Sequence, residues 1–390
     1  MAQPGLVLFS LGFRPFFLAA SWFGIVAMLV WVAAYSFGLS STLGNLPAII
    51  WHGHEMIFGY SAAVLSGFLL TSVRNWTGLP TPAGVHLALI VGCWLVARAA
   101  FLVGSDSAII VACIADLLFM VLFIWGFSRP VIAVKQWRQA GIIAKLVTLL
   151  LSNLLFYAGL FGYIAEGVSW GLYSGLYMVL ALILALIRRV FPFFVSMATA
   201  KKVVLKNYLW LDRLSLVFFF CFWMVSVFFH EPIATAILAG SLALLHGVRM
   251  VSWYAREIWR QPLLWVIYLA YGFIVIGFLL QAAAPWLATQ LLSLHAFAIG
   301  GIGLATIGMM ARVALGHSGR DVYAPRKGLA VIFCLLIFSA LNRTLLPFFW
   351  PEFYGQLVFI AQVCWIVSFA WFIGIYTPIL LQPRIDGQLE

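Results

Sequence analysis

The stretch Trp51-His52-Gly53-His54-Glu55-Met56 places two imidazoles and a carboxylate at the start of an apolar run that continues to Val73. Burying an ionisable group at bilayer depth is costly unless the group is partnered, so such groups are candidates for function. Imidazole nitrogens bind transition metals, and a neighbouring carboxylate such as Glu55 orients a ligand histidine or carries protons. An acidic residue in a first helical turn also complements the helix dipole, so the residues leave both interpretations of Glu55 open.

Three more histidines share apolar surroundings, and two do not. A single intramembrane histidine is usually a hydrogen-bonded packing residue, but five imidazoles without nearby cysteine and with few carboxylates favour copper or haem iron over magnesium or calcium. The predicted metal ligands are His52, His54, His246, His295 and His317. His86 and His230 lie at expected helix ends, where headgroup water solvates them.

Helical geometry limits how these histidines combine. Residues i and i+2 of an α-helix lie about 200° apart, so His52 and His54 share a metal only if Trp51–His54 is extended or frayed. Otherwise they serve two different centres, or one is a ligand and the other a hydrogen-bonding neighbour. His295 and His317 are roughly 33 Å apart along a continuous helix, which requires two sites or a broken helix. We favour an outer cluster of His52, His54 and His295. His246 then lies near the floor of that cluster or in an inner site with His317.

Other polar residues extend these hypotheses. Arg249 and Arg312, close in sequence to His246 and His317, are candidate partners of cofactor carboxylates, although positive charge at the cytoplasmic face explains both as well. We therefore predict cofactor binding by His246, His317, Arg249 and Arg312. The proton-path candidates are Glu55 and Asp116, with Asn153 and Arg98 as weaker ones. No catalytic residue is assigned.

The run Ile299-Gly300-Gly301-Ile302-Gly303-Leu304-Ala305-Thr306-Ile307-Gly308 carries four glycines. Such a smooth helix surface suits either a flat macrocycle or, more commonly in membranes, another helix.

The composition indicates an integral membrane protein. Of the 390 residues, 65% are hydrophobic and only 8% are charged, whereas soluble domains carry about 25% charged residues. The five cysteines are isolated and form no C-x-x-C or C-x-x-C-H motif, which argues against Fe–S clusters, disulfide frameworks and covalently attached haem. The net charge of +11 is confined to short loops, so topology explains it better than nucleic-acid binding. No cleavable signal is expected at the N-terminus.

Apolar segments of about 20 residues are long enough to cross the bilayer as helices. We predict an all-α, polytopic protein that forms one transmembrane helical domain over residues 1–390. The twelve expected helices are 15–38, 51–73, 84–103, 107–127, 142–165, 171–195, 208–229, 233–253, 262–284, 289–315, 329–347 and 354–381. All Lys and Arg residues except Arg98 and Arg343 fall on the side of the two termini. Both termini are therefore predicted to be cytoplasmic.

Five stretches of the chain are distinctive: Phe13-Arg14-Pro15-Phe16-Phe17, Trp51-His52-Gly53-His54-Glu55-Met56-Ile57-Phe58-Gly59, Asn75-Trp76-Thr77-Gly78, His246-Gly247-Val248-Arg249-Met250 and Arg312-Val313-Ala314-Leu315-Gly316-His317-Ser318-Gly319-Arg320. At these stretches the sequence resembles the NnrS family of bacterial inner-membrane proteins. The resemblance covers most of the chain, and the second and fifth stretches together are the most specific.

The resemblance implies a multi-pass protein of the bacterial inner (cytoplasmic) membrane that contains haem b and copper. It further implies that the protein binds or converts nitric oxide, in nitric oxide metabolism or nitrosative-stress resistance. Turnover as an oxidoreductase would require a quinol or redox-protein electron donor, because the chain has no c-type haem or Fe–S motif. Two alternatives stay open: a proton-coupled or metal-ion transporter using the same His, Asp and Glu residues, and a membrane metal sensor or assembly factor.

Overall fold

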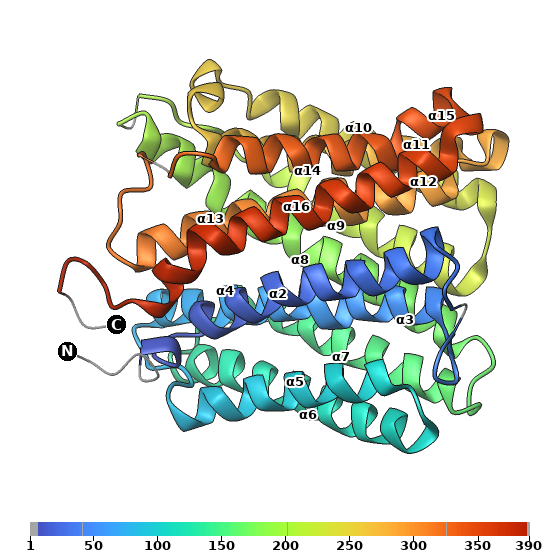
Figure 1. Ribbon diagram of the computed structural model, residues 1–390. Coiled ribbons are helices and arrows are strands. Elements are labelled where there is room, and N and C mark those ends of the chain that lie inside the picture. The colour runs from blue at the N-terminus through green and yellow to red at the C-terminus, as the bar shows by residue number, and fades with distance from the viewer. Residues whose placement is uncertain (1–6, 41, 201, 325, 388–390) are drawn as a thin grey trace. The chain divides into compact units, whose positions relative to one another are not determined.

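The computed structural model describes residues 7–40, 42–200, 202–324 and 326–387. In that part of the chain almost all regular structure is helical (Figure 1). Among the described residues, twelve helical segments are long and apolar enough to cross a membrane. The chain is therefore an all-α, multi-pass membrane protein.

The helical segments include several π-helical (η) and 3₁₀ (η) turns. The elements, in chain order, are α2 (Phe13–Trp31), η1 (Val32–Ser36), β1 (Thr42–Leu43), β2 (Leu46–Pro47), α3 (Ala48–His54), η2 (Glu55–Ser61), α4 (Ala62–Thr77), α5 (Val85–Val103), α6 (Asp106–Ala133), η3 (Trp137–Gln139), α7 (Ala140–Leu160), α8 (Gly167–Ala198), α9 (Leu209–Met224), η4 (Val225–Phe229), α10 (Pro232–Ser252), η5 (Arg256–Arg260), α11 (Pro262–Leu287), α12 (Gln290–His295), η6 (Ala296–Gly303), α13 (Leu304–His317), α14 (Leu329–Thr344), α15 (Leu346–Phe349), η7 (Pro351–Phe353) and α16 (Tyr354–Leu381).

Each predicted transmembrane segment overlaps one helical span of the structure, including 329–347, which is seen as Leu329–Phe349. Both ends of 142–165 deviate in the same direction, because the span is Trp137–Leu160. That helix ends early because Gly162 adopts a left-handed conformation at φ 81°, which glycine accommodates without strain. The orientation of the termini stays a prediction.

The chain divides into two compact units. Unit 1 comprises Met1–Val179, Met310–Val322 and Phe369–Glu390; unit 2 comprises Leu180–Met309 and Tyr323–Ser368. Helices α8, α13 and α16 contribute residues to both. The expectation of one domain over the whole chain stays a prediction.

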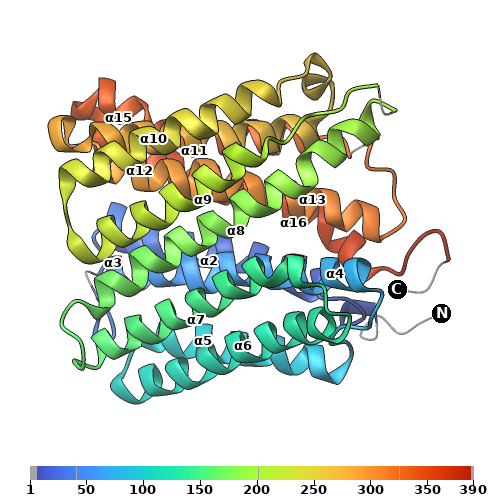
Figure 2. The ribbon, with the colours of Figure 1, turned by 180° about the vertical axis from the view of Figure 1, so that it is seen from behind.

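In unit 1, α2, α4, α5, α6 and α7 run side by side, as both ribbon views show (Figures 1 and 2).

Helix α6 has one exposed apolar face and one buried face. Ile110, Ile114, Leu118, Val121 and Trp125, spaced three or four residues apart, are largely exposed. This apolar stripe is suited to lipid contact. The opposite face is buried and includes Ala112, Phe119 and, unusually, Asp116.

A short hairpin fixes the start of the second span. Strands β1 and β2 pair in antiparallel fashion around a turn at Gly44. A Cβ on Gly44 would lie 2.4 Å from the carbonyl oxygen of Gly104. The Asn45 backbone N–H donates to that same oxygen at 3.0 Å. The hairpin thereby ties the entrance of α3 to the loop between α5 and α6.

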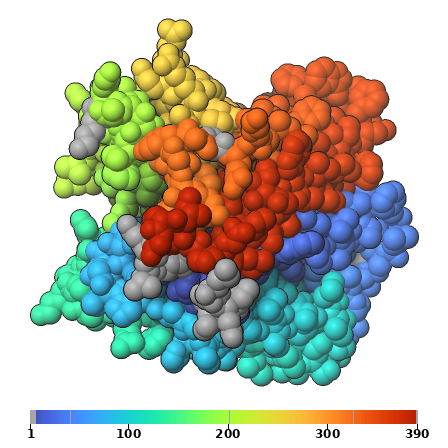
Figure 3. All heavy atoms as spheres, turned by 60° about the vertical axis from the view of Figure 1, so that its left-hand side comes forward, coloured from blue at the N-terminus to red at the C-terminus, as the bar shows by residue number. Residues whose placement is uncertain are grey.

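A buried arginine joins the two ends of the chain within unit 1. The guanidinium of Arg14 donates to the carbonyl oxygens of Leu380 at 2.8 Å and Gln382 at 2.7 Å. These carbonyls lie at the C-terminus of α16, where a cation also complements the helix dipole. The space-filling view shows the red C-terminal atoms beside dark blue atoms from the start of the chain (Figure 3). Arg14 is thus a packing residue and not a surface charge.

In unit 2, α11 packs against α10 and η6. The glycine-rich run supplies the close approach between η6 and α11. A Cβ on Gly300 would lie 2.5 Å from Phe273, and one on Gly301 would lie 2.7 Å from Ile274. Of the two uses expected for these glycines, the structure shows helix packing.

Candidate functional site

The second span resolves the geometric choice posed by His52 and His54. Helix α3 is α-helical through His54 and continues as the π-helix η2 from Glu55. The two imidazoles therefore meet different neighbours. His52 is half-buried and stacks on Trp31, with ring centroids 4.4 Å apart and planes 8° apart. His54 is completely buried.

Both ring nitrogens of His54 are occupied by hydrogen-bond partners. Nδ1 lies 3.0 Å from Glu55 Oε1, and Nε2 lies 3.0 Å from Asn153 Oδ1. Nε2 is also 3.4 Å from Asp116 Oδ2. The Asn153 amide nitrogen donates to Asp116 Oδ2 at 2.8 Å, which fixes the amide so that its oxygen faces the ring.

Arg98 lies between the two carboxylates. Its Nη1 donates to Glu55 Oε1, and its Nη2 lies 2.6 Å from Asp116 Oδ1. All three side chains are at most 4% exposed. The Tyr157 hydroxyl adds a longer contact of 3.4 Å to Asp116 Oδ2. We call His54, Glu55, Arg98, Asp116, Asn153 and Tyr157 the charge network.

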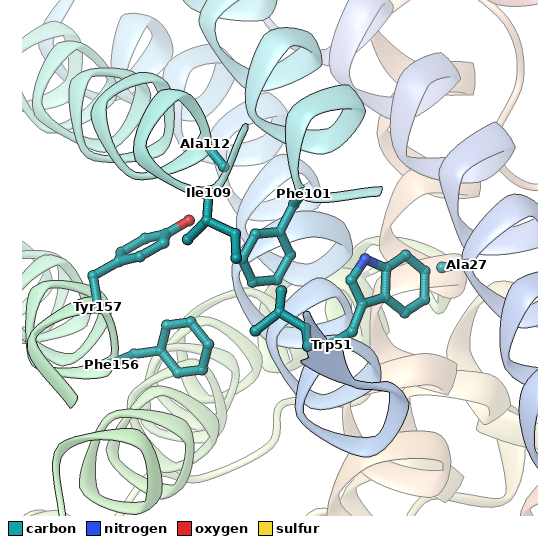
Figure 4. Packing of buried hydrophobic residues seen from close by; sticks show 8 residues of the cluster. Ala27, Trp51, Phe101, Ile109, Ala112, Phe156 and Tyr157 are labelled. Carbon is teal, nitrogen blue, oxygen red and sulfur yellow. The ribbon is translucent and has the colours of Figure 1, made fainter. Parts of the chain in front are cut away.

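Aromatic rings enclose the charge network. The His54 ring lies 4.4 Å from Phe101, 4.5 Å from Phe156 and 5.0 Å from Phe58, measured between centroids. In Figure 4, Phe101 and Phe156 converge from α5 and α7, and the Tyr157 hydroxyl points toward α6. These walls exclude water, so every charge depends on its protein partners.

The π-helix η2 positions both Glu55 and a glycine against the network. A Cβ on Gly59 would lie 2.8 Å from Arg98 Nη1 and 2.7 Å from Phe23. The Trp94 indole N–H donates to the Gly59 carbonyl at 3.0 Å. Glycine at this position therefore allows the guanidinium to reach Glu55.

Unit 2 holds a different buried histidine. His246 on α10 is 2% exposed, and its Nδ1 lies 2.5 Å from the Tyr271 hydroxyl on α11. Its ring stacks on Phe278, with centroids 5.7 Å apart and planes 6° apart. The other nitrogen, Nε2, is buried and makes no hydrogen bond to any described residue. An anchored imidazole with one free nitrogen is the arrangement that a metal ligand requires.

Arg249 has a protein partner for its charge. Its Nη2 donates to Asp212 Oδ1 at 2.9 Å, and Arg188 Nε donates to the same oxygen at 2.7 Å. The guanidinium also lies 5.8 Å from the centroid of the Trp253 ring. Two arginines share one carboxylate here, which leaves the group with a net positive charge.

The remaining predicted site residues lie in or beside the tenth span. His295 ends α12, and its Nδ1 lies 2.9 Å from the Leu291 carbonyl. His317 ends α13 in unit 1, where its ring lies 5.7 Å from Phe13. Arg312 is buried on α13. The span Gln290–His317 is one uninterrupted helical segment, so His295 and His317 cannot share one ion.

The structure brings some predicted residues together and separates others. Among residues 7–40, 42–200, 202–324 and 326–387, no three His, Cys, Asp or Glu side chains form a group that could hold a metal ion. Glu55 and Asp116, the proton-path candidates, belong with His54 to one charge network. His52, His54 and His317 belong to unit 1, and His246 and His295 to unit 2. The predicted ligand sets that combine the units stay predictions.

Two partners were not found by sequence reasoning. Tyr157 and Tyr271 looked like ordinary aromatic residues of membrane helices, and no local spacing links Tyr271 to His246. The sequence did mark Arg98 as unusual, because it is one of the two basic residues that fall on the side of the membrane opposite the termini. Its burial between two carboxylates explains that exception.

A family model described as NnrS protein matches residues 7–384. The chain belongs to the NnrS family. No curated protein matches it. In this NnrS protein the matched region includes every residue of the charge network and both His246 and Tyr271.

Proposed function

We propose that this NnrS protein binds haem b through His246 Nε2 and acts on nitric oxide. Family membership favours a function related to nitric oxide. The observation that carries the haem assignment is the buried, unpartnered Nε2 of His246. A haem held there would supply iron as a binding site for a diatomic ligand such as nitric oxide.

The residues around His246 would suit an imidazole that holds haem iron. The tautomer with its hydrogen on Nδ1 donates to the Tyr271 oxygen and leaves the Nε2 lone pair available. Stacking on Phe278 holds the ring plane, and the site is closed to water. Arg249 is already paired with Asp212, so a cofactor carboxylate would have to share it or replace that carboxylate.

Copper and catalytic turnover form the second part of the proposal. They rest on family membership, with His52, His295 and His317 as the remaining candidate ligands for copper. Reduction of nitric oxide would need a quinol or redox-protein donor, because the chain has no c-type haem or Fe–S motif to supply the electrons. Continuous consumption of nitric oxide with an added donor would identify an enzyme, whereas stoichiometric binding would identify a sensor or buffer.

The absorption spectrum of the purified protein tests the haem assignment. We expect a Soret band that shifts when nitric oxide is added. His246→Ala should lose or shift the band, whereas His230→Ala, at an exposed helix end, should keep it. A wild-type protein without a Soret band, or an unchanged spectrum in His246→Ala, contradicts the assignment.

A second candidate function is an ion-coupled transporter. The observation that favours it is the charge network, because buried ionisable groups in membrane spans often form ion pathways. Proton-driven uptake of a metal ion into proteoliposomes that contain the haem-free protein would support this candidate over the first.

A further inference from the structure

We infer that His54 is the hub of a metal-free charge network and does not ligate a metal. This inference concerns unit 1 alone and does not depend on whether His246 binds haem. It assigns a purpose to the second imidazole and the carboxylate of the Trp51–Met56 motif, which the haem assignment leaves unused.

The first argument is the direction of the hydrogen bonds. Asn153 Oδ1 faces Nε2, because the amide nitrogen of Asn153 donates to Asp116 and also lies 3.4 Å from the Met120 sulfur. An amide oxygen only accepts, so Nε2 carries a hydrogen and offers no lone pair. A metal at Nε2 would require the whole Asn153–Asp116 pairing to break.

The second argument is the lack of space at Nδ1. This nitrogen faces Glu55 Oε1 at 3.0 Å, and that oxygen also accepts from Arg98. A metal ion between Nδ1 and Oε1 would stand beside the guanidinium cation that already occupies the carboxylate. The rings of Phe101 and Phe156 pack against the imidazole, with centroids 4.4 and 4.5 Å from its own.

The third argument is charge balance. Arg98 offsets one carboxylate, and one hydrogen between His54 Nδ1 and Glu55 Oε1 offsets the other, whichever atom holds it. The network is then neutral, and its parts lie on α3, η2, α5, α6 and α7. A further cation would leave uncompensated charge in an interior that solvent does not reach.

The charge network therefore links the second, third, fourth and fifth membrane spans through side-chain contacts. His54 connects Glu55 on its own span to Asn153 on α7, and Arg98 on α5 connects Glu55 to Asp116 on α6. Removing the imidazole should therefore loosen the packing of unit 1 without changing the amount of bound metal.

A double-mutant cycle with metal analysis tests the inference. The full-length protein and the variants His54→Ala, Asn153→Ala and the double variant are purified, incubated with copper(I) and haemin, and desalted. Copper and iron per chain, the Soret band and the melting temperature in detergent are then measured. We expect each single variant to melt at a lower temperature than the wild type. The double variant should melt at a temperature no lower than that of the less stable single variant. Copper and iron per chain should equal those of the wild type.

The matched control is His52→Ala, two residues earlier on α3, whose ring stacks on Trp31 outside the network. Its effect on melting temperature should add to that of Asn153→Ala. A loss of copper or iron in His54→Ala but not in Asn153→Ala overturns the inference, as do additive losses of melting temperature in the His54–Asn153 cycle. If His54→Ala does not fold, His54→Gln takes its place under the same criteria. A wild type without haem contradicts the proposed function, whereas the cycle still decides the role of His54.

Discussion

The two most buried histidines of this protein, His54 and His246, are held in opposite ways. His54 uses both ring nitrogens in a network of charged groups. His246 uses one nitrogen for a tyrosine hydroxyl, stacks on a phenylalanine and keeps the other nitrogen without a hydrogen bond. Burial alone therefore does not identify a ligand histidine. The partners of each ring nitrogen distinguish a structural imidazole from one that is available to a metal.

The largest expected effect is at Arg98, which holds the charges of the His54 region. Arg98→Ala would leave two buried carboxylates without their shared cation. Removing one partner of a buried ion pair costs about 3–5 kcal/mol. The melting temperature in detergent should fall sharply. Arg343→Ala, which removes a cation lying 5.4 Å from the centroid of the Tyr354 ring, is the control and should have a much smaller effect. Equal effects would contradict the central place of Arg98.

The next effect is at Gly59, where the backbone leaves room for Arg98. A Cβ would approach both Phe23 and the guanidinium within 2.8 Å. We expect Gly59→Ala to destabilise the protein by about 1–3 kcal/mol through overpacking. Gly92→Ala on α5 meets no atom within 4 Å and is the matched control. It should be neutral or stabilising, because glycine in a helix costs roughly 0.5–1 kcal/mol relative to alanine.

A smaller effect is expected at Tyr271, whose hydroxyl contacts His246. Tyr271→Phe removes the oxygen that orients His246. Loss of such a partner typically weakens metal binding by about 10–100-fold. The rate of haem transfer to an apoprotein acceptor measures this change, and the variant should still fold. An unchanged transfer rate would show that the hydroxyl does not orient a ligand.

The smallest effect is expected at Tyr157, the matching tyrosine of the charge network. Its hydroxyl makes only a 3.4 Å contact to Asp116, which keeps its bonds to Arg98 and Asn153. Tyr157→Phe should lower stability by less than about 1 kcal/mol and leave haem and copper content unchanged. If instead Tyr157→Phe altered the Soret band and Tyr271→Phe did not, the roles assigned to the two regions would be reversed.

The sequence alone determined the class of protein and its spans. Hydrophobic runs of about 20 residues are a local property, so they locate the twelve helical segments without knowledge of their packing. The motifs identified the family for the same reason, since they are contiguous in the chain. The sequence also singled out the five candidate ligand histidines, Glu55, Asp116, Asn153 and Arg98 as polar residues in apolar surroundings.

Only the tertiary structure decided which of these residues meet. The partners of Asp116 lie on α5 and α7, at positions that no periodicity along the chain connects. A metal shared by His52 and His54 required Trp51–His54 to be extended or frayed, but this stretch is α-helical and directs the two rings to different neighbours. Residue types and spacing indicate what chemistry a side chain can perform. Which ring nitrogen stays free depends on contacts between helices, and those contacts are set by packing.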